Sequence, residues 1–279
     1  MKIGLVDFYL DEWHANHYPQ MLHDCSGGEI EAVYAYGRIA SPLTGVTSAQ
    51  WCCRYGLTLC PTIEEVVEKS DGIIVLSPDN CEMHVDLCRI PLASGKPVYV
   101  DKTFAPDLAS AKRIFAMAEA GGSPVYSSSA LRFATEYADV NRADITAINS
   151  WGPMDYETYS IHQLEPMMML MGADASRVQF SASENWYQLL IAFADGRFGT
   201  ISGFRNGSPF MMNIAGREES RVIEVKSAYF HNFMMELVDF FRTRTVKVPH
   251  CDTLRIMAVR EAGLRAAACP GQWVEVPSV

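Results

Sequence analysis

The sequence predicts an α/β protein with a doubly wound parallel sheet in its first half and an α+β domain with an open, largely antiparallel sheet in its second. Strand-like apolar runs alternate with single helices up to about residue 125, which is typical of right-handed βαβ crossovers and a sheet covered on both faces. In the second half, two apolar runs flank Asp195-Gly196, a strong hairpin signal. We therefore expect two domains, 1–125 and 126–279, and the last helices could pack back on the first domain.

The elements of the first half each have a signal of their own. We expect buried strands at residues 2–6, 31–36, 73–76 and 97–101, with a further strand starting at 125–126. Thr62 and Glu65 form a capping-box pattern at the start of a short helix. A second helix is expected from about Asn80 to Gly95. Asp107 is a plausible N-cap for a third, whose apolar residues fall on one face.

The second half has a different character. Strand-like segments follow one another, at residues 187–193, 198–204, 209–216 and 220–226. Two helices come late, at residues 229–244 and 252–267, the second with Asp252 as its expected cap. Residues 273–276 close the chain as a strand. Consecutive strands joined by short turns favour antiparallel pairing.

Composition excludes several classes of protein. The 279 residues are 49% hydrophobic and 20% charged, which is typical of a folded globular protein. A formal net charge of -10 argues against a nucleic-acid partner, since such a surface needs clustered Lys and Arg. We see no leader peptide and no apolar run long enough to span a membrane, and the 8 cysteines form no CxxC pair. These features predict a cytoplasmic protein with free thiols and no membrane partner.

The ends of the predicted parallel strands are where a ligand would bind. In open α/β sheets, ligands lie beyond the carboxyl ends of the strands, where the strand order reverses. Asp101 and Lys102 follow the strand at 97–101 directly. Partial burial and neighbouring charges at such a place can lower the pKa of a lysine toward acid–base use, although a plain surface lysine fits the pattern as well.

The stretch from Asp71 to Phe115 resembles the core of the Gfo/Idh/MocA family, the glucose–fructose oxidoreductase and inositol dehydrogenase group. Six positions carry the likeness: Pro78, His84, Gly95, Lys96, Val98 and Lys102. Asp101 stands where the family has Glu, and Thr103 where it has Pro. Residues 160–172 resemble the family's histidine-bearing helix, and the hairpin and late helices also correspond, so the resemblance covers nearly the whole chain.

The resemblance implies a Rossmann-type first domain that binds NAD or NADP and a second domain that binds substrate. It implies an oxidoreductase that passes a hydride between the nicotinamide and a CH–OH carbon of a sugar, a polyol or a related hydroxy or keto compound. Lys102 and His162 are then the catalytic residues, beside the reacting hydroxyl. The expected partners are a small carbohydrate-like substrate and further copies of the chain, as a homodimer or homotetramer.

Lys102 and His162 are chemically suited to the oxidation of an alcohol. A neutral imidazole can accept the proton of an alcohol near neutral pH, and Lys102 could stabilise the alkoxide. Pro166 is poorly tolerated inside a helix, so we expect His162 at or just before a helix start, where the neutral imidazole is favoured. Glu165 could orient His162, or act as an acid near the helix start. We expect three residues to contact substrate: Arg132, Tyr159 and Glu165.

The expected cofactor contacts come from the strand ends and comprise Asp7, Phe8, His14, Tyr36, Arg38, Ser77, Pro78, His84 and Asp101. The first turn departs from the family, because Asp7 and Tyr9 stand near the first two positions of its glycine-rich turn. Side chains there would obstruct the close approach of a diphosphate. Tyr36 stands where an acid usually holds the ribose of NAD, and Arg38 could contact the 2′-phosphate of NADP.

These departures leave alternatives open. The chain could be a family member that has lost ordinary dinucleotide binding and serves as a ligand-binding or regulatory protein. It could also be a lyase or hydrolase that uses the same crevice. We expect no metal site, although His14 and His17 have a spacing that can ligate zinc or manganese.

Overall fold

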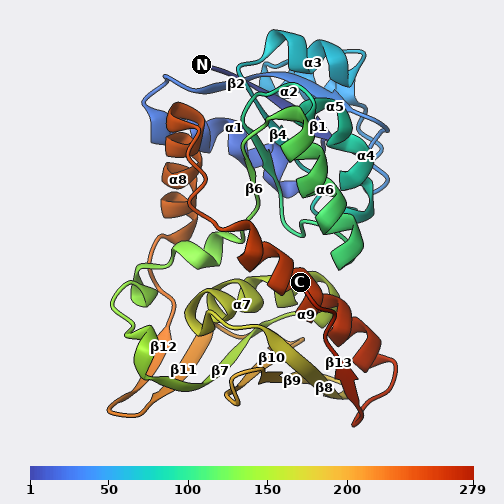
Figure 1. The fold of residues 1–279 in the computed structure, drawn as a ribbon. Coiled ribbons are helices and arrows are strands. Elements are labelled where there is room, and N and C mark those ends of the chain that lie inside the picture. Colours follow the sequence, from blue (N-terminus) through green and yellow to red (C-terminus); the bar gives the residue numbers. More distant parts are fainter. The chain divides into compact units, whose positions relative to one another are not determined.

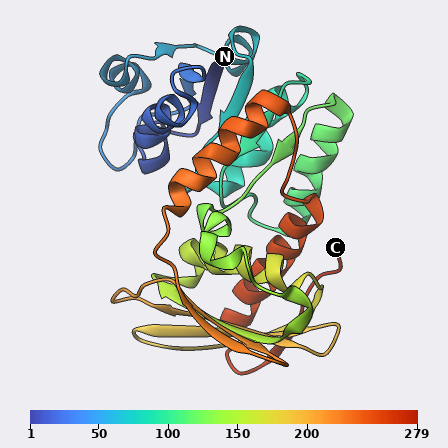
Figure 2. The same cartoon turned by 90° about the vertical axis from the view of Figure 1, so that its left-hand side faces the viewer.

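The computed structural model describes all of residues 1–279, which divide into two compact units. Unit 1 comprises Met1–Ser128 and Phe233–Pro249, and unit 2 comprises Ser129–Asn232 and His250–Val279. Each unit is built around its own sheet (Figures 1 and 2). None of the helices has the length and apolar character needed to cross a membrane.

The sheet of unit 1 is parallel throughout, as predicted. Its strand order is β3-β2-β1-β4-β5-β6. The strands are β1 (Lys2–Asp7), β2 (Glu31–Gly37), β3 (Thr58–Leu59), β4 (Gly72–Val75), β5 (Val98–Val100) and β6 (Val125–Tyr126). The order reverses between β1 and β4, so the turns that follow these two strands flank the switch point, where ligands bind in such folds.

Six helices connect these strands: α1 (Trp13–Ser26), α2 (Ser48–Tyr55), α3 (Ile63–Lys69), α4 (His84–Leu87), α5 (Arg89–Leu92) and α6 (Leu108–Gly121). Thr62 and Asp107 cap α3 and α6 as predicted. The single helix expected from Asn80 is instead a short 3₁₀ turn followed by α4 and α5. Pro91 explains the break, because it has no N–H to bond the carbonyl of Leu87 and its ring clashes with that group.

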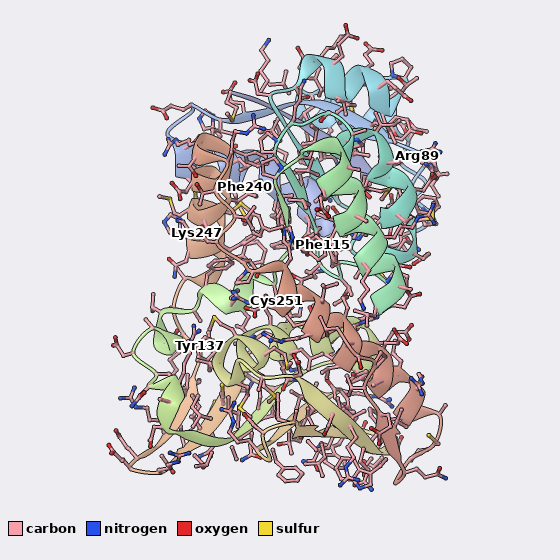
Figure 3. The ribbon with its side chains drawn as sticks, viewed as in Figure 1. Arg89, Phe115, Tyr137, Phe240, Lys247 and Cys251 are labelled. Atoms are coloured by element: carbon pink, nitrogen blue, oxygen red, sulfur yellow. The ribbon has the colours of Figure 1, made fainter.

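Helix α8 (Tyr229–Thr243) contributes to unit 1 from Phe233 onward. The ring of Phe240, which is labelled in Figure 3, lies 4.9 Å from that of Tyr126. The Phe233 ring lies 5.5 Å from that of Tyr99. Gly72 on β4 provides the space for α8, since a Cβ atom there would lie 2.7 Å from the ring of Phe241. Residues from far along the chain therefore complete the core of unit 1.

The sheet of unit 2 has the order β12-β11-β7-β10-β9-β8-β13. Its strands are β7 (Ile145–Pro153), β8 (Ala175–Ser183), β9 (Trp186–Phe193), β10 (Phe198–Phe204), β11 (Met211–Gly216), β12 (Ser220–Glu224) and β13 (Trp273–Glu275). The hairpin predicted at Asp195-Gly196 joins β9 to β10. All pairs are antiparallel except β7 with β10, which confirms a largely antiparallel sheet.

Two helices of unit 2 pack against this sheet and against each other, α7 (Tyr156–Met171) and α9 (His250–Ala267). The expectation that His162 stands at a helix start is wrong, because α7 begins at Tyr156 and continues through Pro166. Pro166 lacks only the N–H that would bond the carbonyl of His162, and packing on the sheet outweighs that loss. His162 therefore lies in the second turn, where the helix dipole gives the neutral imidazole little advantage.

Candidate functional site

A buried carboxylate stands at the carboxyl end of β5. Asp101 is fully buried, and His14 Nδ1 contacts its Oδ2 atom. Tyr18 and Tyr99 donate hydrogen bonds to its Oδ1 atom at 3.3 and 3.2 Å. Burial raises the pKa of Asp101, but the charges of His14 and Lys102 and the bond from His14 outweigh it and lower the pKa to about 2.

Two further acids lie in the same region and have the opposite character. Asp7 ends β1, is 1% exposed, and receives no hydrogen bond from a side chain on either carboxyl oxygen. Burial, and after it the charge of Glu12, raise the pKa of Asp7 well above its usual value. Burial also raises the pKa of Glu12 to about 8, with Asp101 adding to the shift and Lys102 opposing it. The edge of the sheet thus holds three acids close enough to influence one another.

Glu12 also caps helix α1. Its Oε2 atom accepts a hydrogen bond from the His14 N–H at 2.7 Å, and its Oε1 atom accepts one from the Ala15 N–H. These N–H groups have no partner within the helix. The N-terminus of the helix that follows the first strand is where a dinucleotide's diphosphate binds in this type of fold, and here it already has a carboxyl ligand.

Tyr9 fills the remaining space of the same turn. Its side chain is almost fully buried, and its hydroxyl donates a hydrogen bond to Asp79 Oδ2 at 2.9 Å. Asp79 belongs to the turn after β4, so this bond joins the two turns that flank the switch point. Phe8, between Asp7 and Tyr9, is partly exposed, and its carbonyl accepts the Ile39 N–H at 3.0 Å.

As they stand, these residues do not fit a dinucleotide's diphosphate. Such a group would need the N–H donors that Glu12 occupies, and it would have to approach the backbone where the side chains of Asp7 and Tyr9 lie. It would also bring negative charge next to buried acids, which is unfavourable at partly desolvated sites.

The expected ribose contacts at the end of β2 are already engaged. Arg38 Nη1 forms an ion pair with Asp86 Oδ2 at 2.6 Å, and Tyr36 beside it is partly exposed. A 2′-phosphate would have to compete with Asp86 for this guanidinium group.

His84 has a structural role within unit 1. It is fully buried, with Nδ1 3.0 Å from the Phe104 carbonyl oxygen and Nε2 2.6 Å from that of Leu76. The ring thereby ties the end of β4 to the loop after β5. Neither nitrogen is left for a cofactor, in contrast to the expectation for this residue.

The turn after β4 is strained at Ser77, whose φ of 84° is unusual for a residue with a side chain. Its Oγ atom donates to the Asn80 carbonyl at 3.1 Å. Pro78 follows directly. Backbone strain of this kind is often found at ligand-binding turns, and this turn lies beside the switch point.

Lys102 is the cation at this edge of the sheet. Its side chain is partly exposed and makes no hydrogen bond or ion pair within unit 1. Its charge nevertheless lowers the pKa of both Asp101 and Glu12. An ammonium group that is held near acids but not bound by them remains available to a ligand.

In unit 2, His162 lies on α7 beside Ser129, the last of the three consecutive serines 127–129 that follow β6. The distance between Ser129 Oγ and His162 Nδ1 is 2.7 Å. The ring of Tyr159 packs edge-on against the imidazole at 4.9 Å, and that of Phe210 lies 6.0 Å away. Ser129 fixes the orientation of the imidazole, and the aromatic rings shield it.

Arg132 and Glu165 belong to a buried ion-pair network. Arg132 Nη1 donates to Glu165 Oε1 at 3.0 Å, and its Nη2 atom donates to Asp252 Oδ2 at 2.7 Å. Glu165 Oε2 also accepts the Ser129 N–H at 3.3 Å, so Glu165 reaches His162 through Ser129. Asp252, expected as a helix cap, lies inside the first turn of α9 and binds Arg132 instead.

The two histidines of the first turn do not form a metal site. His14 contacts Asp101, whereas His17 bonds the Trp13 carbonyl at 2.6 Å and stacks on the Trp13 ring. No group of three or more His, Cys, Asp or Glu side chains has an arrangement suited to a metal ion.

Four residues of these two regions were not predicted from the sequence: Tyr18, Tyr99, Ser129 and Asp79. Tyr18 stands four positions after His14 and thus on the same face of α1, which was a usable signal. Ser129 follows a strand end, another usable signal. Tyr99 and Asp79 gain their partners only through the fold.

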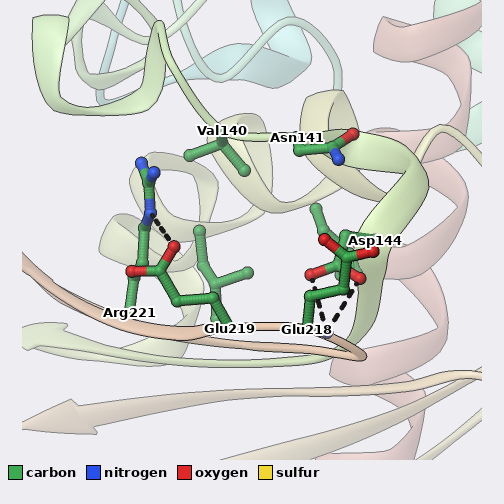
Figure 4. Close-up of a pocket in the computed structure, with 9 residues that line it drawn as sticks. Val140, Asn141, Asp144, Glu218, Glu219 and Arg221 are labelled. Atoms are coloured by element: carbon green, nitrogen blue, oxygen red, sulfur yellow. Dashed lines mark hydrogen bonds and ion pairs between the residues drawn. The ribbon is translucent and has the colours of Figure 1, made fainter.

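A separate small pocket lies in unit 2 beside the hairpin of β11 and β12 (Figure 4). Asp144 lines it, and its Oδ1 atom accepts the N–H groups of Arg217 and Glu218 at 2.9 and 3.1 Å. Glu219 faces Arg221 across 3.9 Å. These bonds stabilise the hairpin, and the polar groups of the pocket are largely used by the protein itself.

Comparison with known proteins agrees with the fold. A model of a family described as an oxidoreductase family with an NAD-binding Rossmann fold matches residues 11–128. No curated protein matches the sequence.

Solved structures similar to this chain include inositol dehydrogenases of lactobacilli. One is myo-inositol dehydrogenase from Lactobacillus casei in complex with NAD(H) and myo-inositol, with a TM-score of 0.83 and 11% identity over 100% of this chain and 97% of that chain. Another is myo-inositol 2-dehydrogenase from Lactobacillus plantarum, with a TM-score of 0.78 and 13% identity over 99% of both chains. A third is scyllo-inositol dehydrogenase from Lactobacillus casei, with a TM-score of 0.78 and 14% identity over 99% of this chain and 98% of that chain. At such identities the likeness concerns the fold.

Proposed function

Residues 11–128 of this chain belong to the Gfo/Idh/MocA oxidoreductase family, as the resemblance predicted, and from this premise we propose that the protein is a dehydrogenase or reductase acting on CH–OH groups. Its substrate is a small sugar, polyol or related hydroxy or keto compound. NAD or NADP is the redox partner, in line with the description of the family. We further propose that the chain works as a homodimer or homotetramer.

The observation that carries this proposal is the position of Lys102. It follows a parallel strand at the carboxyl edge of the sheet, its ammonium group makes no hydrogen bond or ion pair within unit 1, and the preceding residue, Asp101, is a buried carboxylate. Such a cation can stabilise negative charge on a substrate oxygen. The resemblance assigns the same role to this residue.

His162 is the proposed proton acceptor. Oxidation of an alcohol carbon requires that the hydroxyl proton leave, and an imidazole is suited to accept it near neutral pH. If Ser129 donates its hydroxyl proton to Nδ1, then Nδ1 carries no proton and Nε2 carries one. If instead Nδ1 carries the proton and donates it to Ser129 Oγ, then Nε2 carries no proton and is the basic atom. We propose the latter, in which His162 Nδ1–H donates to Ser129 Oγ.

We propose positioning roles, and no substrate contact, for Arg132 and Glu165. Both are held in the network with Asp252, and Glu165 acts on His162 by way of Ser129. Tyr159 remains a proposed substrate contact, because it is partly exposed and packs against the imidazole.

Turnover with a panel of sugars and polyols, measured with NAD and with NADP, tests the proposal. Once a substrate is found, Lys102→Ala and His162→Ala should each lower kcat by a factor of about 10²–10⁴. Lys69→Ala is the control, because Lys69 forms an exposed ion pair with Glu65 on α3 and should leave kcat unchanged. Turnover that survives both site substitutions would show that these roles are wrong.

One observation favours a second candidate. With Asp7, Tyr9 and Glu12 in the first turn, the chain could bind a small ligand in the same crevice without a dinucleotide and act as a ligand-binding or regulatory protein. Calorimetric titration with NAD, NADH, NADP and NADPH separates the two. Heat of binding with one of the four supports the oxidoreductase, whereas none with all four supports the second candidate.

A further inference from the structure

Helix α1 is capped in a different way from the other helices of unit 1. Thr47, Thr62 and Asp107 cap α2, α3 and α6, and each accepts one backbone N–H through its side chain. Glu12 accepts two, from His14 and Ala15, with one on each carboxyl oxygen. Ser, Thr, Asp and Asn are the usual N-caps, so a glutamate that folds back over the helix end is an exception.

The carboxyl group of Glu12 lies on the donors that a bound anion would use. Backbone N–H groups and the helix dipole together make a helix N-terminus suited to phosphate groups. Glu12 is 7% exposed, so its side chain is packed into this place and does not extend into solvent.

Asp7 is an independent sign that the space is closed to anions. It is buried at the same turn, and no side chain donates a hydrogen bond to either of its oxygens. A diphosphate placed here would meet the buried side chain of Asp7, and this turn supplies no cation to bind it. A further negative charge beside a buried acid is also less well screened than it would be in water.

We propose that Glu12 is an internal competitor for the diphosphate group of the cofactor, so that NAD or NADP binds only when the Glu12 carboxyl group leaves the N–H groups of His14 and Ala15. The choice of this ligand rests on the proposed function. Asp7 adds to the effect because its buried side chain still occupies the turn after Glu12 has moved. The consequence is that the native side chain weakens dinucleotide binding, and its removal strengthens it.

The test compares Glu12→Ser with the native protein and with Asp107→Ser. Serine is itself a good N-cap, so both variants keep a capped helix and lose only a carboxyl group. Asp107 is the matched control, since it caps α6 through the Ser110 N–H at 2.7 Å and lies outside the first turn. Affinities for NADH and NADPH are measured by titration of the nicotinamide fluorescence.

Glu12→Ser should bind NADH or NADPH at least about tenfold more tightly than the native protein, whereas Asp107→Ser should match the native protein. Inorganic pyrophosphate should raise the Tm of Glu12→Ser and leave that of the native protein and of Asp107→Ser unchanged. Equal affinities in Glu12→Ser and native protein, or no binding of either nucleotide to Glu12→Ser, overturn the proposal.

The experiment includes a replacement variant and a separate test of the proposed function. If Glu12→Ser does not fold, as judged by circular dichroism, Glu12→Gly takes its place, because glycine is tolerated at a helix cap. The proposed function is judged separately, by turnover of the native protein with its substrate. Tighter nucleotide binding by Glu12→Ser without any turnover would thus uphold this inference and count against the proposed function.

Discussion

At the scale of single residues, three buried acids within one small region behave in opposite ways. Asp101 receives hydrogen bonds from Tyr18 and Tyr99 and contacts His14, so its charged form is stabilised. Asp7 has no side-chain donor, and Glu12 has only the two backbone N–H groups of α1. Donors and cations, and not burial alone, therefore decide which acid of this region is ionised.

The stability of the protein should depend on pH through Glu12. Burial raises the pKa of Glu12 from 4.5 to about 8 in the folded protein, so between these values the folded state holds a proton that the unfolded state has released. The free energy of unfolding should therefore fall as the pH rises from about 4.5 to 8, by up to about 1.4 kcal/mol per pH unit from this residue. Asp7, whose pKa is also raised, acts in the same sense.

Urea denaturation at several pH values checks this expectation. Glu12→Gln has no carboxyl group to titrate, so its free energy of unfolding should fall less steeply over the same range than that of the native protein. The contribution of Asp101 to the free energy of unfolding changes with pH in the opposite sense, because folding lowers the pKa of Asp101 to about 2. This contribution is lost only as the pH falls from about 3.8 toward 2. An unchanged slope in Glu12→Gln would mean that Glu12 is ionised throughout.

At the scale of elements, proline has different consequences in two helices. Pro91 of α5 accompanies a break, because α4 ends at Leu87, whereas Pro166 lies inside α7 without interrupting it. The difference follows from packing: most residues of α7 are buried against the sheet of unit 2 and against α9, and this burial outweighs one missing hydrogen bond. Sequence rules for proline describe the hydrogen bond that the helix loses and the clash of the ring, but not the stability that the helix gains by packing on other elements.

The contact between α8 and β4 should be sensitive to a single methyl group. A Cβ atom at Gly72 would lie 2.7 Å from the ring of Phe241, so Gly72→Ala should lower the free energy of unfolding by about 1–3 kcal/mol. Phe241→Leu leaves a gap at the same place and should also be destabilising. Urea denaturation should show that the double variant is less destabilised than the sum of the two single variants. Additive effects would contradict this contact.

At the scale of the whole molecule, the chain builds unit 1 from two separate segments, Met1–Ser128 and Phe233–Pro249. The second segment supplies side chains that are almost completely buried in unit 1, including Phe233, Phe240 and Phe241. Each such side chain contributes about 1.5–3 kcal/mol when it is buried. Together they amount to a large part of the 5–15 kcal/mol that stabilises an ordinary domain.

A fragment of residues 1–128 should therefore lack a cooperative unfolding transition. A single chain that joins Met1–Ser128 to Phe233–Pro249 through a flexible Gly/Ser linker should recover one, because it restores the buried face of α8. Thermal melts followed by circular dichroism compare the two. If the shorter fragment unfolds at the same Tm as the linked chain, then α8 is not needed for the stability of unit 1.

Much of the fold was readable from the sequence, because its signals are local. Alternating apolar runs and helices predicted the parallel sheet, Asp195-Gly196 predicted a hairpin, and Thr62 and Asp107 predicted helix starts. The missed elements are α2 and β3, which are short, and the strands β7 and β8, whose many polar and small residues left only a weak apolar pattern.

The site was decided by the tertiary structure. The sequence by itself placed Lys102 after a strand and showed that the first turn lacks glycines, since both facts concern neighbouring residues. It could not show that Asp101 contacts His14, 87 positions away, or that Arg132 binds Asp252, 120 positions away. Nor could it show that Glu12 folds back onto its own helix. Whether a polar group is free to bind a ligand depends on the partners that folding brings to it, and those partners are distant in the chain.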